Sequence, residues 1–331
     1  MKALGQIQQV GSCPLVSRST HMRAAVFLAL VVAFHGIRAD DLDVIVDTTV
    51  AAKRRGEAYA RLTTSEFRAI APKLAKLIGT HPVLTGIGPS TKQPWSELQL
   101  SEGDRIGCTL SQLWHHHIEK GQTRGELIPL LLDLLDDSTI GSGRELAVSE
   151  LSVRLHFGRS LSDPSIPPID SILSRLEVLA TDAKQPNDFR RSLVTILFEH
   201  GDPNKYLASA IELTSAEDTP LRQAESFRFC TPTSNAGKLT AANRKKYLRH
   251  SYQLLEQIDD GRSGTGYFLA MHIGQFVGVP PVRDGQGAFA PDQRLPKYQG
   301  QHGLTESFFQ DTVINARKWW SEHKNEYEAG A

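Results

Sequence analysis

Three consecutive histidines, His115, His116 and His117, are the residues of this chain whose type is best suited to binding a metal ion. Successive residues of a helix are rotated by about 100°, so three neighbours cannot all face one ion. His117 continues an apolar stripe of the same segment, whereas His115 shares a face with Glu119, four residues later. Because a zinc site takes at least three protein ligands, His115 and Glu119 are weak metal candidates, and packing or surface roles are favoured.

No other segment supplies a catalytic or cofactor motif. The chain contains no His-Glu-x-x-His, Glu-x-x-His or Cys-x-x-Cys pattern. The stretch DDGRSGTGYFLAMHIG, residues 259–274, superficially resembles a phosphate loop, but it follows a helical segment and lacks the Gly-Lys-Ser/Thr ending. We interpret it as a glycine-rich turn before a helix and expect no cofactor. An enzyme site assembled from dispersed residues, with His200, His250 or His272 among them, stays an alternative.

Two segments favour binding over catalysis. The stretch NRKKYLRH, residues 243–250, concentrates positive charge beside a tyrosine, which suits a polyanion or cell-envelope ligand. A second stretch, residues 279–303, is rich in proline and glycine, and links of that length tend to be functional or disordered. We interpret it as a strap that covers the end of a helical array, and Trp319 on the last helix could stack on a ligand. The binding candidates are Arg244, Lys245, Lys246, Arg249, Arg283, Arg294, Tyr298 and Trp319.

The elements that must position these residues are helices. Apolar residues recur at helical spacing almost everywhere after residue 39, and strand-like alternation is nearly absent, so the fold class is all-α. Thr219-Pro220 and Asp202-Pro203 place a capping side chain before a proline, as at the start of a helix. The expected helices span 66–78, 106–117, 126–136, 144–156, 170–181, 188–200, 203–214, 220–230, 240–258, 264–277 and 304–327.

Three stretches repeat one pattern, in which a leucine-rich helix and a polar link precede an arginine that opens a second helix. The arginines are Arg144, Arg190 and Arg222, at uneven steps. The pattern resembles the HEAT-like repeat family over residues 124–231, and the closest local match is EDTPLRQAESF. The resemblance implies a helical-hairpin array, or α-solenoid, in which the arginines are structural. An irregular α-helical bundle is the alternative, because independent helices also produce uneven repeats.

The beginning of the chain has the layout of a secretory signal. Arg23 precedes the apolar run 24–34, and a small residue, Ala39, precedes two aspartates. The run is shorter than the ~20 residues of a membrane span, so we expect cleavage near Ala39 and no span afterwards. Met22 is a possible true start. The sequence therefore predicts export to a periplasm or to the medium.

The charge balance argues against nucleic acid as a partner, and the two remaining cysteines leave one possible disulfide open. Residues 1–39 hold four of the 37 basic side chains and none of the 37 acidic ones, so the remainder is mildly acidic and nucleic acid is not expected as a partner. Whether Cys108 and Cys230 pair is left open, since two distant cysteines of a helical array need not approach each other.

Together these features predict four segments. Residues 1–39 are the signal, 40–123 are N-terminal helices, 124–260 are HEAT-like repeats, and 261–331 are C-terminal helices with the extended loop 279–303. The predicted function is that of an exported, non-catalytic module that binds or scaffolds a protein partner. Three or more acidic or imidazole groups within reach of one ion would instead favour the enzyme.

Overall fold

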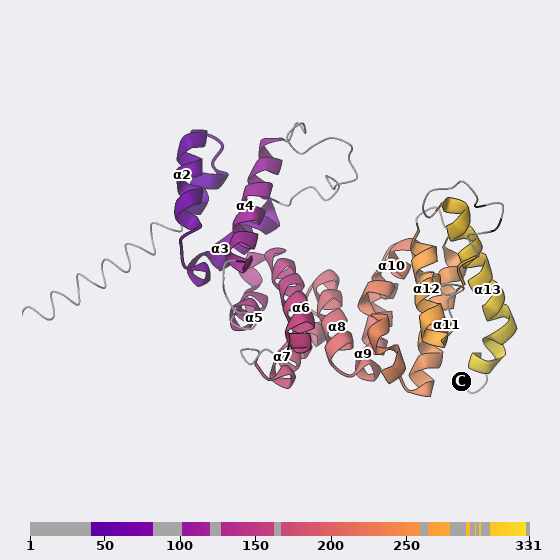
Figure 1. Cartoon of the computed structure of the whole chain (residues 1–331). Coiled ribbons are helices and arrows are strands. Elements are labelled where there is room, and N and C mark those ends of the chain that lie inside the picture. The colour runs from indigo at the N-terminus through magenta and orange to yellow at the C-terminus, as the bar shows by residue number, and fades with distance from the viewer. Residues whose placement is uncertain are drawn as a thin grey trace, which may run out of the picture. The chain divides into compact units, whose positions relative to one another are not determined.

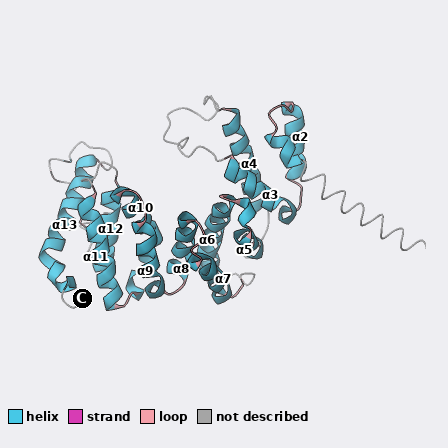
Figure 2. Cartoon of the chain, turned by 180° about the vertical axis from the view of Figure 1, so that it is seen from behind, coloured by secondary structure: helices cyan, strands magenta, loops and turns pink. Residues whose placement is uncertain are grey.

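The structure is a computed structural model that describes residues 41–81, 101–119, 127–161, 167–258, 264–278, 289–291, 295, 298 and 305–328. Helices are its regular elements, and the described residues contain no strand (Figure 2). The prediction of an all-α fold is therefore confirmed. The predicted signal, residues 1–39, lies outside the described residues, as does most of the strap.

The chain divides into two compact units. The first comprises Met1–Gln122 and Thr139–Gly143, and the second comprises Thr123–Ser138 and Arg144–Ala331. The three-part division of the mature chain made from the sequence stays a prediction.

The first unit is built around α2 (Ala52–Leu62), α3 (Phe67–Thr80) and α4 (Glu102–Glu119), preceded by a short helical stretch at residues 41–46 (Figure 1). A capping box opens α4: the backbone N–H of Asp104 donates to Ser101 Oγ at 3.2 Å, and that of Ser101 donates to Asp104 Oδ2 at 3.1 Å. The α3 and α4 helices pack together through one apolar core. Its largest members are Leu62, Phe67, Ile70, Leu74, Leu110, Leu113 and Trp114.

Two glycines allow the segment Thr139–Gly143 to pack directly on α3 within this unit. A Cβ atom on Gly143 would lie 2.4 Å from the carbonyl oxygen of Ala75, and one on Gly79 would lie 2.5 Å from Ser142 Oγ. The Ser142 hydroxyl donates to the carbonyl of Gly79 at 3.0 Å. Any side chain at these glycines would push the two backbones apart.

The second unit is a succession of helices, and from α7 onward each packs on the next helix in the chain. From α8 onward every helix contacts the next helix and the next but one, so alternate helices lie in two layers (Figure 1). The helices are α5 (Ile128–Asp136), α6 (Gly143–Leu161), α7 (Ile169–Thr181), α8 (Asn187–His200), α9 (Pro203–Ser215), α10 (Pro220–Cys230), α11 (Ala241–Gln257), α12 (Thr265–Val277) and α13 (Glu306–Glu328). The second unit also contains the short 3-10 helix η3 (Thr233–Lys238), and a second one, η2 (Ser138–Ile140), lies mostly in the first unit.

The boundaries of these helices follow from local chemistry. The Asp202 side chain accepts from the backbone N–H of Asn204 at 2.9 Å, and Thr219 Oγ1 accepts from that of Arg222 at 3.3 Å. Gly201 follows the last residue of α8, and its N–H donates to the carbonyl of Leu197 at 2.9 Å. The starts predicted at Pro203 and Pro220 are confirmed.

Two of the three aligned arginines occupy the same position relative to the preceding helix. Arg144 Nε donates to the carbonyl of Leu135 at 2.7 Å, and Arg190 Nε donates to that of Ala180 at 2.9 Å. Each guanidinium thus binds a carbonyl at or near the C-terminal end of the preceding long helix, where such groups lack a partner within the helix.

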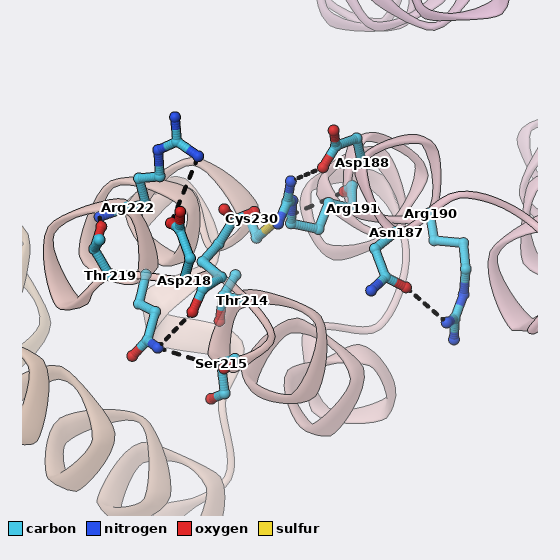
Figure 3. Close-up of polar contacts among 12 residues, drawn as sticks. Asn187, Asp188, Arg190, Arg191, Thr214, Ser215, Asp218, Thr219, Arg222 and Cys230 are labelled. Atoms are coloured by element: carbon cyan, nitrogen blue, oxygen red, sulfur yellow. Dashed lines mark hydrogen bonds and ion pairs between the residues drawn. The ribbon is translucent and has the colours of Figure 1, made fainter. Parts of the chain in front are cut away.

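The third arginine does not make this contact. Arg222 is exposed and pairs with Asp218 at 3.5 Å, as Figure 3 shows. Its neighbour Gln223 binds the preceding turn instead, and its Nε2 donates to the carbonyls of Glu217 at 2.8 Å and Ser215 at 3.4 Å. In this hairpin Gln223, one residue after the aligned arginine, therefore makes the bond to the preceding turn.

Polar contacts also join each pair of helices to the following one. Arg175 of α7 pairs with Asp133 and Asp136 of α5, and Lys205 of α9 pairs with Glu177 of α7. The second helices make polar contacts with later parts of the chain. Arg144 of α6 donates to Gln185 Oε1, before α8, at 2.7 Å, His156 of α6 contacts Glu199 of α8, and Arg191 of α8 forms an ion pair with Glu217, after α9.

Candidate binding surface

The histidine row of α4 is used inside the first unit. His117 Nε2 lies 2.9 Å from the carbonyl oxygen of Leu62, and His116 Nε2 lies 3.2 Å from that of Thr63. A carbonyl can only accept, so both imidazoles carry their proton on Nε2. The buried ring of His117 also stacks on Phe67, with ring centroids 5.1 Å apart. These two histidines therefore satisfy carbonyls at the end of α2.

The remaining metal candidates, His115 and Glu119, are both exposed on α4. Among the residues that the structure describes, no group of three or more His, Cys, Asp or Glu side chains could hold one metal ion. Cys108 and Cys230 are free thiols, and burial raises the pKa of the Cys230 thiol to about 11. At neutral pH that thiol is protonated, the form that is neither nucleophile nor metal ligand.

The first unit also contains an open cleft of about 450 Å³ between α2 and α4. Ile106 and Tyr59 contribute apolar surface to it, and Arg55 and Arg105 contribute positive charge. Arg55 is already paired with Glu102 of the same cleft at 3.2 Å. This ion pair neutralises much of the charge that a ligand would meet.

The basic run predicted as a polyanion site lies on α11, and part of it is engaged within the second unit. Arg249 Nη2 donates to the carbonyl of Tyr327 in the last turn of α13 at 3.0 Å, a place where a cation is favourable. Lys246 is exposed, while Arg244 and Lys245 are half-buried. The run thus helps to join α11 to α13, and its binding of a polyanion stays a prediction.

The described part of the strap packs on α12 and α13. Tyr298 is buried with Ala290, Tyr267 and Phe308, and its hydroxyl donates to the carboxylate of Asp311. The carbonyl of Phe289 accepts from Asn315 Nδ2 at 2.9 Å. The predicted binding residues Arg283 and Arg294 lie outside the described residues.

Trp319 is the centre of an aromatic cluster. Its ring stacks on His323 with centroids 4.3 Å apart, and Phe289 and Tyr252 lie within 5.9 and 6.3 Å. The neighbouring Trp320 is buried and stacks on Tyr252 at 4.3 Å. These rings pack Phe289 of the strap and α13 against α11, and ligand stacking on Trp319 stays a prediction.

A different surface, formed by α10 and α12, was not among the predicted sites. The α10 helix buries Ala224, Phe227 and Cys230 and leaves Phe229 56% exposed. The α12 helix is apolar on nearly all sides, and Phe268 is still 44% exposed. Two large phenyl rings on adjacent helices are therefore in contact with water.

A guanidinium joins the two rings. The Cζ atom of Arg228 lies 4.2 Å from the ring centroid of Phe229 and 5.2 Å from that of Phe268, which is cation–π geometry. We call Arg228, Phe229 and Phe268 the Arg228 surface. Although α10 also carries Glu225, Arg228 forms no ion pair with any carboxylate among the described residues.

Polar atoms beneath this surface also lack partners. Arg228 Nε and His272 Nδ1 are buried, and neither has a hydrogen-bond partner within the described part of the chain. Burial lowers the pKa of His272 to about 4, and the positive charge of Arg228 adds to that effect. The imidazole of His272 is therefore uncharged at neutral pH.

The sequence contains a weak signal for this surface. Phe227 belongs to the apolar stripe of α10, whereas Phe229 lies two residues later, on a different side of the helix. An aromatic residue off the stripe next to an arginine is a usual composition for an interface. The proximity of Phe268 depends on the packing of α10 on α12, which the sequence does not specify.

Comparison with protein-family models, with curated proteins and with solved structures found no match in any of the three. The arrangement of the described residues is therefore the basis for assigning a function.

Proposed function

We propose that the chain is a non-catalytic binding module that docks a protein partner on the Arg228 surface of its second unit. The observation that carries this proposal is the pair of exposed rings, Phe229 and Phe268, both in cation–π contact with a guanidinium that has no ion-pair partner among the described residues. Aromatic residues and arginine are the side chains most enriched at the energetic centres of interfaces. Covering the exposed part of both rings would contribute roughly 2 to 3 kcal/mol from apolar burial.

We further propose that the second unit is a HEAT-like array of helical hairpins. The matching bonds of Arg144 and Arg190 support this, since each ties a second helix to the preceding first helix. The contacts that step from α5 to α7 and from α7 to α9 support it as well. A stack of such hairpins presents an extended surface on which a protein partner can bind without any catalytic group.

Export remains part of the proposal. It rests on the signal-like residues 1–39. In the described part of the chain, no helix is both long and apolar enough to span a membrane. The compartment of the proposed partner is then a periplasm or the medium.

The proposal is tested by affinity capture on the full chain with two matched variants. Phe229→Ser with Phe268→Ser removes the exposed rings, and Val178→Ser with Val153→Ser removes other exposed apolar side chains of the second unit. Proteins captured from the native cell envelope and medium are quantified by mass spectrometry. We expect a discrete set to be lost with the phenylalanine variant and retained with the valine variant. Identical sets for all three proteins would contradict the proposal.

A further inference from the structure

The Arg228 surface also indicates what kind of segment it binds. The guanidinium carries five N–H donors in a planar fork that fits a carboxylate. The two rings beside it, Phe229 and Phe268, present apolar surface to the same space. A ligand that satisfies both features must place a carboxylate next to an apolar side chain.

We propose that the Arg228 surface binds acidic, apolar peptide segments, in which Asp or Glu alternates with Phe or Leu. This inference rests on the proposed protein-binding function and adds the chemistry of the partner. The carboxylate would pair with Arg228, and the adjacent apolar side chain would pack on Phe229 and Phe268.

Charge complementarity is the main argument for an acidic partner. Arg228 is half-buried, its Nε has no partner in the described residues, and no carboxylate there neutralises it. Burial and the charge of Arg228 lower the pKa of His272 to about 4, so this imidazole is neutral at pH 7 and does not compensate the guanidinium charge. A hydrogen bond between a guanidinium and a carboxylate is stronger than one between neutral groups.

Three other arginines of the described residues lack this combination. Arg222, on the same helix, is exposed but pairs with Asp218 at 3.5 Å. Arg55, in the cleft of the first unit, pairs with Glu102. Arg249 donates to a carbonyl of α13. Arg228 differs from all three in having exposed aromatic rings and no ion pair or hydrogen bond among the described residues.

The test uses three fluorescein-labelled peptides and the full chain. The first peptide repeats Asp-Phe-Asp-Leu, the second replaces each Asp by Asn, and the third replaces each apolar residue by Ser. Binding is measured by fluorescence anisotropy for the wild type, for Arg228→Gln, and for Arg222→Gln as the matched control on α10. Circular dichroism verifies that each variant is folded.

We expect the acidic, apolar peptide to bind the wild type and Arg222→Gln equally, and to bind Arg228→Gln at least about tenfold more weakly, as loss of one charge-assisted contact predicts. Both other peptides should also bind at least about tenfold more weakly to the wild type. No binding, or equal binding of the Asp and Asn peptides, would overturn the proposed chemistry.

The variants and peptides separate a preference for acidic segments from docking itself. If the Asn peptide binds as well as the Asp peptide and both are lost with Phe229→Ser and Phe268→Ser, the surface binds apolar segments without regard to charge. The docking function then stands while the acidic partner is excluded. If capture of partners is insensitive to the phenylalanine changes, the docking function itself is wrong.

Discussion

The histidine row of α4 and the Arg228 surface contain the same kinds of side chain, a basic group against aromatic rings, with opposite outcomes. His117 stacks on Phe67 and binds the carbonyl of Leu62, so its polar group is satisfied within the first unit. Arg228 lies against Phe229 and Phe268, and its Nε has no partner among the described residues. The two sites therefore share residue types and differ in whether the basic group has a polar partner, which is why we propose docking only at the Arg228 surface.

The largest expected effect on stability is at His117, whose hydrogen bond lies within the first unit. His117→Leu removes a buried hydrogen bond and leaves the Leu62 carbonyl without it, so the free energy of unfolding of the first unit should fall by about 2 to 3 kcal/mol. Urea denaturation followed by circular dichroism measures this change. The exposed His115 serves as control, since His115→Leu should change stability by less than about 0.5 kcal/mol. Equal effects of the two substitutions would show that the bond to α2 is unimportant.

The second effect is a loss of stability at mildly acid pH. Burial lowers the pKa of His250 and of His272 to about 4 each, from 6.5, so the unfolded chain binds more protons than the folded chain between these values. Stability is then fully present above pH 6.5 and declines as the pH falls towards 4. With allowance for partial exposure, the loss between pH 7 and pH 5 is about 2 kcal/mol.

Urea unfolding at pH 7, 6 and 5 checks this prediction. The neighbouring charges that also lower these pKa values are those of Lys246 for His250 and Arg228 for His272. The double variant His250→Gln with His272→Gln should have a flatter pH profile than the wild type. A profile of unchanged slope would assign the acid sensitivity to other groups.

A third, smaller effect on stability should differ between the aligned arginines Arg190 and Arg222. Arg190→Met removes the bond to the carbonyl of Ala180 and should lower the free energy of unfolding by about 1 to 2 kcal/mol. Arg222→Met removes an exposed ion pair with Asp218 and should cost less than about 0.5 kcal/mol. Thermal unfolding of both variants measures the difference. Comparable losses would argue against an array in which the arginine-to-carbonyl bond is structural.

The smallest effect on stability is expected at the Arg228 surface. Arg228→Gln breaks no hydrogen bond or ion pair among the described residues, so the free energy of unfolding should change by about 0.5 kcal/mol or less. The same substitution should abolish most binding of the acidic peptide. Differential scanning fluorimetry checks the first part. A marked destabilisation would mean that Arg228 acts as His117 does, as a structural residue.

Most of the helices could be predicted from the sequence because their apolar residues follow helical spacing. The starts of α9 and α10 at Pro203 and Pro220 were predicted from their caps. The α2 helix was missed, since its segment AKRRGEAYARL buries only Ala58 and Leu62 and so has almost no apolar stripe. Its C-terminal carbonyls are bound by histidines more than 50 residues later, a contact that local patterns do not reveal.

The candidate site was less predictable than the fold. The basic run on α11 was predicted as a binding site because its charges are adjacent in sequence, yet Arg249 donates a hydrogen bond to a carbonyl of α13. Arg228 stands alone among uncharged neighbours in SFRFC, and Phe268 is forty residues away. Only the packing of α10 on α12 brings them together. A site formed across two helices depends on tertiary contacts, which periodicity does not encode.

Photo-cross-linking tests whether ligands bind at the Arg228 surface. The acidic, apolar peptide, with a benzophenone on its phenylalanine, is irradiated with the full chain, and the attached residues are identified by mass spectrometry. We predict attachment within α10 and α12, near Phe229 and Phe268, and its loss in Arg228→Gln. Attachment to the basic run of α11 or to the cleft of the first unit, or no attachment, would show that the peptide does not bind at the Arg228 surface.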